Sequence, residues 1–323
     1  METNLLLTLP TYDDVLAAHE RIRPYIHRTP ILTSTQIGEM IGATLHFKCE
    51  NLQKAGVFKA RGACNAVFGL SEDLTAKGVA THSSGNHGLA LSYAAWRRGI
   101  PVSVVMPRTA PQAKKDAVRA YGGTIVECEP STSSREAVFA EVVAKSGADF
   151  VHPYNDERVI AGQGTCAKEM IEDLGELDAI VAPIGGGGMV SGTCLTCSTM
   201  APKVEIYAAE PEQADDAYQT FKTGQLVAYD APVTIADGLK VPLKDRTWHF
   251  VRNYVTDVLI VTESEIIDAM RLVWARMKII IEPSSAVAVA SILKNRALFA
   301  GKRVGVILTG GNVDLNKLPW QTN

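Results

Sequence analysis

The strongest constraint on the fold is a regular alternation of short β-branched apolar runs with longer amphipathic segments. Several of the short runs, such as residues 179–182, are apolar throughout, as is typical of strands covered on both faces of a sheet. Parallel strands need long crossover connections, and the segments between the runs are long enough to supply helices. The sequence therefore predicts an α/β fold with parallel sheets, with strands at residues 44–50, 78–82, 102–106, 124–128, 179–182, 204–209, 258–261 and 304–308.

One helix start is marked by its own sequence. Thr262 followed three residues later by Glu265 is a capping box, which predicts a helix over 263–277 directly after a strand. Apolar periodicity predicts the other crossover helices at residues 86–98, 110–121, 135–145 and 160–174.

Domain boundaries have to come from the grouping of these units, because no repeat, low-complexity tract or linker interrupts the chain. Compact strand–helix units between residues 77 and 153 predict a small domain with a four-stranded sheet. Residues 1–76 and 154–323 would then form a larger domain. In open α/β sheets ligands bind at the carboxyl ends of strands, so we expect the binding site between the two domains.

Composition excludes several classes of partner and location. The chain is 46% hydrophobic and 21% charged, which excludes an intrinsically disordered protein. With 32 basic and 35 acidic residues and a net charge of −3, binding to nucleic acid or to an anionic membrane is not indicated. No apolar stretch reaches the length of a membrane helix, and the first residues lack a secretory pattern. The six cysteines are scattered, which predicts reduced thiols and a cytoplasmic protein. Cys194 and Cys197 form a C-x-x-C that we interpret as helix packing rather than as a zinc or redox site.

The segment 179–192 carries the clearest functional signal. An apolar strand leads into Gly185, Gly186, Gly187 and Gly188 and then into a small-residue helix. Such a loop presents backbone N–H groups and a helix N-terminus to a phosphate. It matches neither a dinucleotide fingerprint nor a P-loop, so a single phosphate on a small cofactor fits better. The alternative is a glycine-rich turn that only permits close packing.

Two further loops follow predicted strands. Residues 83–88 read Ser-Ser-Gly-Asn-His-Gly and open a helix, where hydroxyl, amide and backbone donors could bind an anion such as an α-carboxylate; the alternative is a helix capped by Ser84 or Asn86. Residues 309–312, Thr-Gly-Gly-Asn, follow the last strand. Three such loops indicate one convergent site.

Lys59 lies between Phe58 and Ala60 in an aromatic and small-residue context. Desolvation in such a context lowers an amine pKa, as Schiff-base chemistry requires. The alternative is an ordinary solvated surface lysine.

These motifs, in this order, resemble the fold-type II pyridoxal-phosphate enzymes. Within them, the chain is most similar to the serine racemase and serine/threonine dehydratase group. The resemblance runs almost end to end, and it implies two open parallel sheets of the tryptophan-synthase-β-like kind. The motifs that carry it are residues 50–54, 58–63, 83–88, 152–154, 160–165, 185–188, 236–238, 281–284 and 309–312.

The resemblance implies pyridoxal 5′-phosphate as cofactor. Lys59 would bind it covalently and then act as the base at Cα, Asn86 would meet the phenolic oxygen, and Thr309 would offer the ring nitrogen a neutral hydroxyl. A neutral partner makes the ring a weaker electron sink and favours rapid loss of a β-leaving group. The full implied cofactor set is Phe58, Lys59, Asn86, Gly185, Gly186, Gly187, Gly188, Met189, Gly238, Glu282 and Thr309.

The resemblance also implies a substrate site and a cation site. Ser84 would face Lys59 across Cα as a second acid/base group, and Arg135 could meet a second substrate carboxylate, as a guanidinium fork is suited to do. A loop using Glu210, the Ala214 carbonyl and Asp216 would bind Mg²⁺, or Ca²⁺ or Mn²⁺; its alternative is a solvated acidic helix start. The implied substrate set is Ser83, Ser84, Asn86, His87, Arg135, His152 and Tyr154.

We therefore expect an ammonia-lyase that dehydrates a small β-hydroxy amino acid, with 3-hydroxyaspartate favoured and serine or threonine as alternatives. A serine or aspartate racemase is the second reading, and a non-catalytic amino-acid sensor is the reading from another class. Residues 239–242 and Leu89 depart from the racemase pattern, which weakens that assignment and the transfer of its nucleotide-effector site. The resemblance further implies a homodimer, and we expect no C-terminal regulatory domain.

Overall fold

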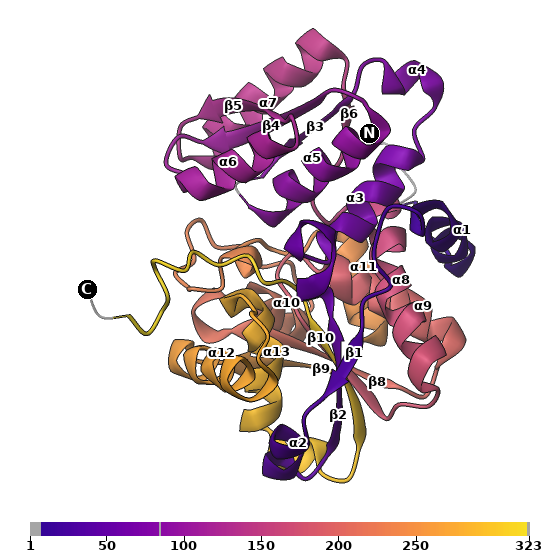
Figure 1. The fold of residues 1–323 in the computed structure, drawn as a ribbon, viewed down its shortest axis with the longest axis vertical. Helices are drawn as coiled ribbons and strands as arrows, with labels where there is room; N and C mark the ends of the chain where they lie inside the picture. Colours follow the sequence, from indigo (N-terminus) through magenta and orange to yellow (C-terminus); the bar gives the residue numbers. More distant parts are fainter. Residues whose placement is uncertain (1–7, 84, 322–323) are drawn as a thin grey trace.

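The structure, a computed structural model, describes residues 8–83 and 85–321. Its strands form two sheets, one above the other in Figure 1. The six-stranded sheet has the order β1 (Ile31–Thr33), β2 (Thr44–Cys49), β10 (Arg303–Leu308), β7 (Ala179–Pro183), β8 (Glu205–Pro211) and β9 (Asp257–Val261). The four-stranded sheet has the order β5 (Thr124–Cys128), β4 (Val102–Pro107), β3 (Val79–His82) and β6 (Asp149–Phe150).

The predicted parallel pairing is confirmed throughout the described ladders except at one edge. In the large sheet Val306 pairs with Phe47 on one side and with Val181 on the other, and only β1 runs antiparallel, to β2. All eight predicted strands are present. The strands β1 and β6 were not predicted, because runs of three and two residues show no periodicity.

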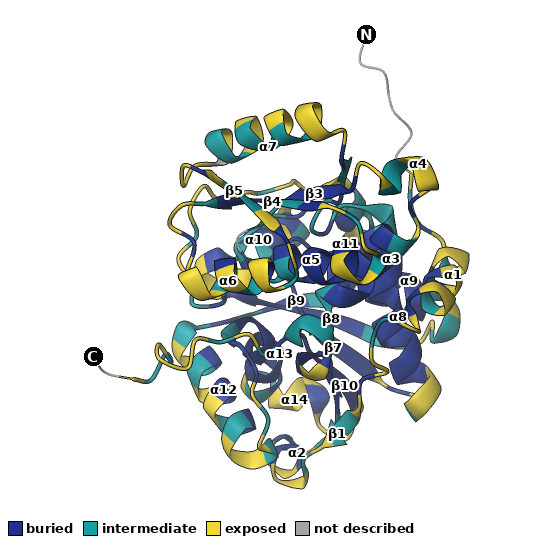
Figure 2. Cartoon of the chain, turned by 45° about the horizontal axis from the view of Figure 1, so that its top comes forward, coloured by how far each residue is buried: buried dark blue, intermediate teal, exposed yellow. Residues whose placement is uncertain are grey.

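Both faces of the large sheet are covered. Alternate side chains of its central strands point to opposite faces and pack in different hydrophobic clusters. Val181 packs in one cluster and Ile180 in another. The first face is covered by α2 (Thr35–Ile41), α12 (Glu263–Met277), α13 (Pro283–Lys294) and α14 (Arg296–Phe299). The second is covered by α1 (Tyr12–Ile22), α8 (Glu157–Leu174), α9 (Gly188–Met200), α10 (Asp216–Thr223) and α11 (Asp245–Tyr254). Figure 2 shows the buried strands β7, β8 and β10 between these layers.

The four-stranded sheet is also covered on both faces. The helices are α3 (Lys59–Phe68), α4 (Glu72–Thr75), α5 (Asn86–Arg98), α6 (Gln112–Ala120) and α7 (Thr132–Ser146). α3 and α5 share a core with β3 and β4, and α7 lies over the outer face (Figure 1). The strands of this sheet lie between residues 79 and 150. That residues 77–153 form a separate domain remains a prediction.

The predicted helices are present with small shifts at their ends. The α5 and α12 bounds match the sequence expectation, and the Thr262–Glu265 capping box is confirmed, with the Glu265 carboxylate 2.8 Å from the Thr262 N–H. All six cysteines are free and buried, and burial raises the pKa of Cys197 to about 12. Among the described residues, no helix combines the length and apolar character needed to cross a membrane.

Candidate active site

Lys59 opens α3, a helix that packs against α5 beside the small sheet and against α8 beside the large one. Nζ donates to the Pro153 carbonyl oxygen at 3.1 Å and lies 5.0 Å from the centroid of the Phe58 ring. Burial lowers the pKa of Lys59 to about 8, although the negative charge of Glu282 opposes this change. A large fraction of this amine is therefore neutral near pH 8, as a nucleophile or base requires.

The backbone joins Lys59 to the end of β10. Val57 forms an antiparallel bridge with Gly310, and the Phe58 N–H donates to the Thr309 carbonyl at 3.0 Å. Thr309 is buried, and its hydroxyl has no hydrogen-bond partner among the described residues. Two segments 250 residues apart in the sequence thus meet, with an amine and an unused hydroxyl in the same region.

The four-glycine loop has the character of an anion cradle. Within the described part of the chain, the backbone N–H groups of Gly185, Gly186 and Gly187 donate to no acceptor. All three residues are buried, and the loop leads directly into α9, whose first N–H groups have no partner within the helix. Buried unpaired N–H groups are rare in proteins, so this loop is built to receive a ligand with several acceptor oxygens.

The other side of the same loop is closely packed, which explains the glycines. A Cβ at Gly186 would overlap the Tyr154 ring, and one at Gly185 would lie 2.7 Å from the Leu239 Cα. Gly187 has a φ of +83°, which side chains rarely allow. Met189, the remaining predicted residue here, is buried in the first turn of α9.

Asn86, at the start of α5, is linked to the start of α13 and to the loop after β10. Its Nδ2 donates to both Glu282 oxygens, at 2.9 and 3.0 Å, and its Oδ1 accepts from Asn312 Nδ2 at 2.9 Å. Burial raises the pKa of Glu282 to about 7, against the hydrogen bonds from Asn86. Gly238 lies alongside, with its N–H 3.0 Å from Ser284 Oγ. Asn86, Glu282 and Gly238 were predicted to share the cofactor site, whereas Asn312 was not, although it belongs to the 309–312 loop that was singled out.

The start of α5 forms a second donor group. The N–H groups of Asn86 and His87 have no acceptor in the described part of the chain, while Ser83 Oγ accepts from the Gly85 N–H at 3.3 Å. His87 Nε2 donates to the Val151 carbonyl at 3.1 Å, and burial lowers the pKa of His87, so the imidazole is neutral and Nδ1 is an acceptor. A substrate carboxylate would therefore meet the backbone of His87 rather than its ring. Ser84, the predicted second acid/base group, lies outside the described residues.

Aromatic side chains cluster at and after the ends of β3 and β6, and their charge environment includes Arg135 on α7. The His82 and His152 ring centroids are 6.1 Å apart, and Tyr154 packs edge-on against His152 at 4.6 Å. Burial lowers the pKa of His82 to about 4 and that of His152 to about 3. Arg135 lies on α7, and its Nε atom is buried with no hydrogen-bond partner in the described structure.

The predicted cation loop brings two carboxylates together. Glu210, at the end of β8, accepts the N–H groups of Ala217 and Tyr218 at 3.0 and 2.8 Å. Asp216 Oδ2 is buried without a partner in the described residues, and burial raises the pKa of Asp216 to about 7. Burial, together with the charge of Asp216, also raises the pKa of Glu210. Ala214 is buried in the same loop. Two buried carboxylates with a free oxygen fit a cation that takes oxygen ligands.

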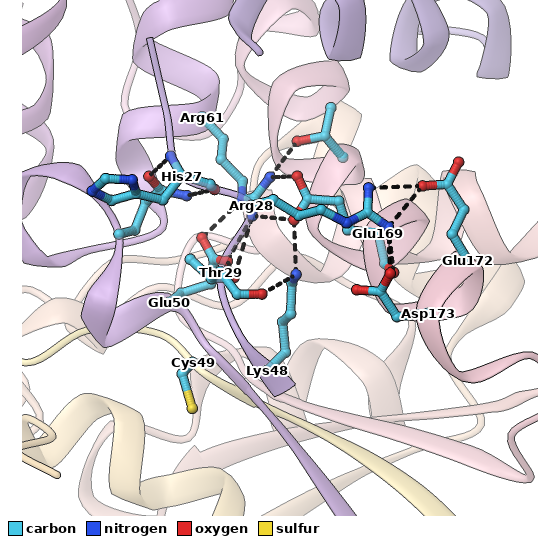
Figure 3. A network of polar contacts seen from close by, with 12 residues as sticks. His27, Arg28, Thr29, Lys48, Cys49, Glu50, Arg61, Glu169, Glu172 and Asp173 are labelled. Atoms are coloured by element: carbon cyan, nitrogen blue, oxygen red, sulfur yellow. Dashed lines mark hydrogen bonds and ion pairs between the residues drawn. The ribbon is translucent and has the colours of Figure 1, made fainter. Parts of the chain in front are cut away.

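A buried ion network surrounds Arg61, two residues after Lys59 in the chain (Figure 3). Arg61, one turn into α3, forms paired hydrogen bonds of 2.8 Å with both oxygens of Glu50 and both oxygens of Glu169. Lys48 Nζ lies 2.7 Å from the same Glu169 carboxylate. The four side chains are essentially inaccessible to solvent. The network ties the first turns of α3 to β2 and α8, and no sequence signal singled it out.

One ion pair joins a helix beside the small sheet to the loop that carries Gly238. Lys114 on α6 contacts Asp237, the neighbour of Gly238. This contact could not be predicted from the sequence, because isolated charged residues are usually solvated.

The donors of this cleft fit pyridoxal phosphate. The free N–H groups at Gly185–Gly187 could hold the phosphate, Lys59 could hold the aldehyde carbon, and the free Thr309 hydroxyl could meet the ring nitrogen. Among the residues that the structure describes, none competes with the cofactor for these groups, apart from the Pro153 carbonyl that accepts from Lys59.

Comparisons with known proteins agree with this geometry. Residues 22–310 match the model of a family described as pyridoxal-phosphate dependent enzymes. A beta-hydroxyaspartate dehydratase from Paracoccus denitrificans (strain Pd 1222) is 68% identical over 97% of this chain and 99% of the relative. A serine racemase from Arabidopsis thaliana is 48% identical over 94% and 93% of the two chains. The solved structure of maize serine racemase superposes with a TM-score of 0.93 at 43% identity, covering 96% of this chain and 95% of that one. The chain belongs to the pyridoxal-phosphate dependent enzyme family.

Proposed function

We propose that the protein is an ammonia-lyase that dehydrates 3-hydroxyaspartate. Loss of water across Cα and Cβ gives an enamine, which becomes iminosuccinate and hydrolyses to oxaloacetate and ammonia. The dehydratase at 68% identity supports this reaction. The choice of a dicarboxylic substrate is supported by Arg135, a partly buried cation whose Nε has no hydrogen-bond partner in the described structure. A guanidinium group of this kind is suited to bind a second carboxylate.

Lys59 is the group that moves the proton. When bound, the cofactor supplies a conjugated ring that withdraws electrons from Cα and acidifies its proton. Lys59 Nζ takes this proton, and its lowered pKa keeps enough neutral amine for the task near pH 8. The Pro153 carbonyl, 3.1 Å from Nζ, orients the amine when it is free to take the proton.

The start of α5 orients the substrate. The free N–H groups of Asn86 and His87 bind the α-carboxylate at a helix N-terminus, where the helix dipole favours an anion. Arg135 binds the second carboxylate from the opposite wall. Holding both ends fixes the Cα–H bond relative to Lys59 and excludes water from one face of the substrate.

We propose that Glu210, Asp216 and the Ala214 carbonyl bind a divalent cation, with Mg²⁺ favoured over Ca²⁺ and Mn²⁺. The support is the free Asp216 oxygen and the mutual repulsion of two buried carboxylates. The cation would hold the loop after β8 and not the reacting atoms.

Racemisation of serine or aspartate is the second candidate function, supported by the serine racemase relatives and by Ser84 in the sequence. The departures at residues 239–242 and Leu89 speak against it. A non-catalytic sensor is disfavoured because the amine at Lys59 and the phosphate cradle are intact.

The test is ammonia release by the cofactor-loaded protein from serine, threonine and each 3-hydroxyaspartate stereoisomer, with chiral analysis of residual substrate. We expect one hydroxyaspartate isomer to be turned over preferentially and Lys59→Ala to abolish turnover. Slow elimination with faster inversion of serine or aspartate would overturn the proposal in favour of a racemase.

We further propose a cytoplasmic homodimer in which residues 77–153 form a small domain that closes over the substrate. The free, buried cysteines fit a reducing compartment, and the Lys114–Asp237 pair joins the two lobes at the cleft. Sedimentation would give the oligomeric state, and small-angle scattering with and without succinate would report closure.

A further inference from the structure

The peptide group between Pro153 and Tyr154 contacts two side chains of the candidate site. Its carbonyl oxygen accepts from Lys59 Nζ at 3.1 Å. Its N–H donates to His152 Nδ1 at 3.3 Å. The C=O and N–H of a trans peptide are fixed in one plane and point in opposite directions. The direction in which the carbonyl meets Lys59 is therefore linked to the position of the His152 ring.

His152 binds the same turn through a second hydrogen bond. Nδ1 also accepts the N–H of Asn155 at 3.0 Å. Burial lowers the pKa of His152 to about 3, so the imidazole is neutral. A ring nitrogen that accepts two N–H groups carries no proton, so the proton of this ring is on Nε2. Nδ1 is thus committed to the backbone, and only Nε2 is left for another partner.

Packing restricts the orientation of the His152 ring. Its centroid lies 4.6 Å from that of Tyr154, 5.5 Å from that of Phe150 and 6.1 Å from that of His82. The Tyr154 ring in turn covers the glycine loop. These neighbours limit rotation of the imidazole, so Nδ1 stays where the two N–H groups meet it.

The segment that contains this peptide is anchored at both ends. At one end, the Val151 carbonyl accepts from His87 Nε2 at 3.1 Å. At the other end, Asn155 Nδ2 donates to Asp245 Oδ1 at 2.7 Å, and Asn155 Oδ1 accepts the Arg246 N–H at 3.2 Å. The segment therefore connects the start of α5 with the start of α11, and its middle peptide contacts the amine.

The charged groups around the ring leave it neutral while the amine titrates. After burial, the charges of Lys244 and Lys59 lower the pKa of His152, as does His82, and the charge of Asp156 opposes them. For Lys59, burial lowers the pKa to about 8 and Glu282 opposes this change. Nδ1 of His152 therefore remains an acceptor throughout the titration of Lys59.

We propose that His152 is a positioning residue that binds the N–H of the Pro153–Tyr154 peptide, aims the carbonyl of that peptide at Lys59 and so holds the free amine in place for proton transfer. A hydrogen bond to the charged form of a group favours that form, so the carbonyl also limits how far burial lowers the pKa of the amine. The inference rests on the proposed function, since it takes Lys59 as the group that binds the cofactor and moves the proton.

The test separates the two nitrogens of the His152 ring. His152→Asn keeps an acceptor close to the place of Nδ1, since an asparagine oxygen binds the N–H two residues later in an Asx turn, but it has no group at the place of Nε2. His152→Gln carries its amide near the place of Nε2 and lacks the acceptor near Nδ1. His152→Leu removes both, and His249→Leu, at a partly exposed histidine on α11, is the control.

Two measurements on the full-length protein report on Lys59. Stopped-flow absorbance gives the rate of covalent attachment of pyridoxal phosphate as a function of pH, with Lys59→Ala as the blank. Steady-state assays of the cofactor-loaded protein give KM and kcat for 3-hydroxyaspartate. The Tm of each variant checks that it is folded.

We expect His152→Leu and His152→Gln to lower both kcat and the high-pH rate of attachment by about tenfold or more, because a misplaced reacting group is costly. The midpoint of attachment should fall by about one pH unit, because the charged amine loses an oriented acceptor. KM should change less than about twofold, since the loss concerns proton transfer and not substrate binding. His152→Asn should restore the rate and the midpoint, and His249→Leu should behave as wild type.

The outcomes separate the two proposals. If attachment requires Lys59 but every His152 variant matches wild type, the positioning role is refuted and the proposed function stands. Rescue by His152→Gln instead of His152→Asn, or a loss in KM instead of kcat, also refutes the role, because the ring would then bind substrate through Nε2. If attachment depends on His152 as expected but hydroxyaspartate is not turned over, the role stands and the proposed function fails. Attachment retained in Lys59→Ala would overturn both.

Discussion

The buried network around Glu169 allows a quantitative prediction. Glu169→Gln keeps the shape of the side chain but removes one of the two carboxylates that neutralise Arg61 and Lys48. These cations are inaccessible to solvent, so water cannot replace the lost charge. Breaking a buried pair in this way costs about 3–5 kcal/mol.

The pKa of Glu169 gives an independent magnitude. Burial opposes ionisation, but the charges of Arg61 and Lys48 outweigh it and lower the pKa from 4.5 to about 2. A difference of that size between the folded and unfolded states corresponds to roughly 3 kcal/mol. Because the folded-state pKa is depressed, this stability is fully present above pH 4.5 and is lost as the pH falls towards 2.

Differential scanning calorimetry at pH 7, with equal cofactor for all variants, measures the effect. For a chain of 323 residues, the unfolding entropy is about 0.7 kcal/mol/K, so 3 kcal/mol lowers Tm by roughly 4–5 °C. The matched control is Glu129→Gln, which breaks an exposed pair with Arg108 and should cost less than about 1 kcal/mol. The loss from Glu169→Gln should also shrink as the pH falls from 4.5 towards 2. Equal Tm values for the two variants, or a pH-independent difference, would refute the reasoning.

Three further predictions concern the cleft. Gly186→Ala should weaken pyridoxal-phosphate binding at least about tenfold, because the new Cβ overlaps the Tyr154 ring; absorbance titration of the apoprotein checks this, and wild-type affinity would contradict it. The rate of covalent cofactor attachment should rise with pH with a midpoint near the Lys59 pKa of about 8, because the neutral amine is the nucleophile; stopped-flow absorbance showing a midpoint near 10.5 would contradict it. Chelation with EDTA should lower both Tm and turnover, Mg²⁺ should restore them, and Asp216→Ala should abolish the response; an unchanged response in that variant would exclude this loop as the cation site.

Sequence reasoning predicted most of the fold because local signals and topology agree. Apolar runs such as 179–182 encode strands buried on both faces, and the Thr262–Glu265 box encodes a helix start in four residues. The edge strand β1 has no comparable signal. Its three residues become a strand only because β2 offers a partner.

For the candidate site, too, some residues could be predicted from the sequence and others could not. Glycines after a strand and a lysine beside an aromatic residue are readable in sequence, because the chemistry needs those residue types in adjacent positions. Tertiary structure alone decided which isolated polar residues meet: Asn312 with Asn86, Lys114 with Asp237, and Arg61 with Glu50, directly after β2, and with Glu169 on α8. Each of these contacts joins segments far apart in the chain. Burial also lowers the pKa values of Lys59, His87 and His152, and these residues become buried only after the two sheets and their helices have packed.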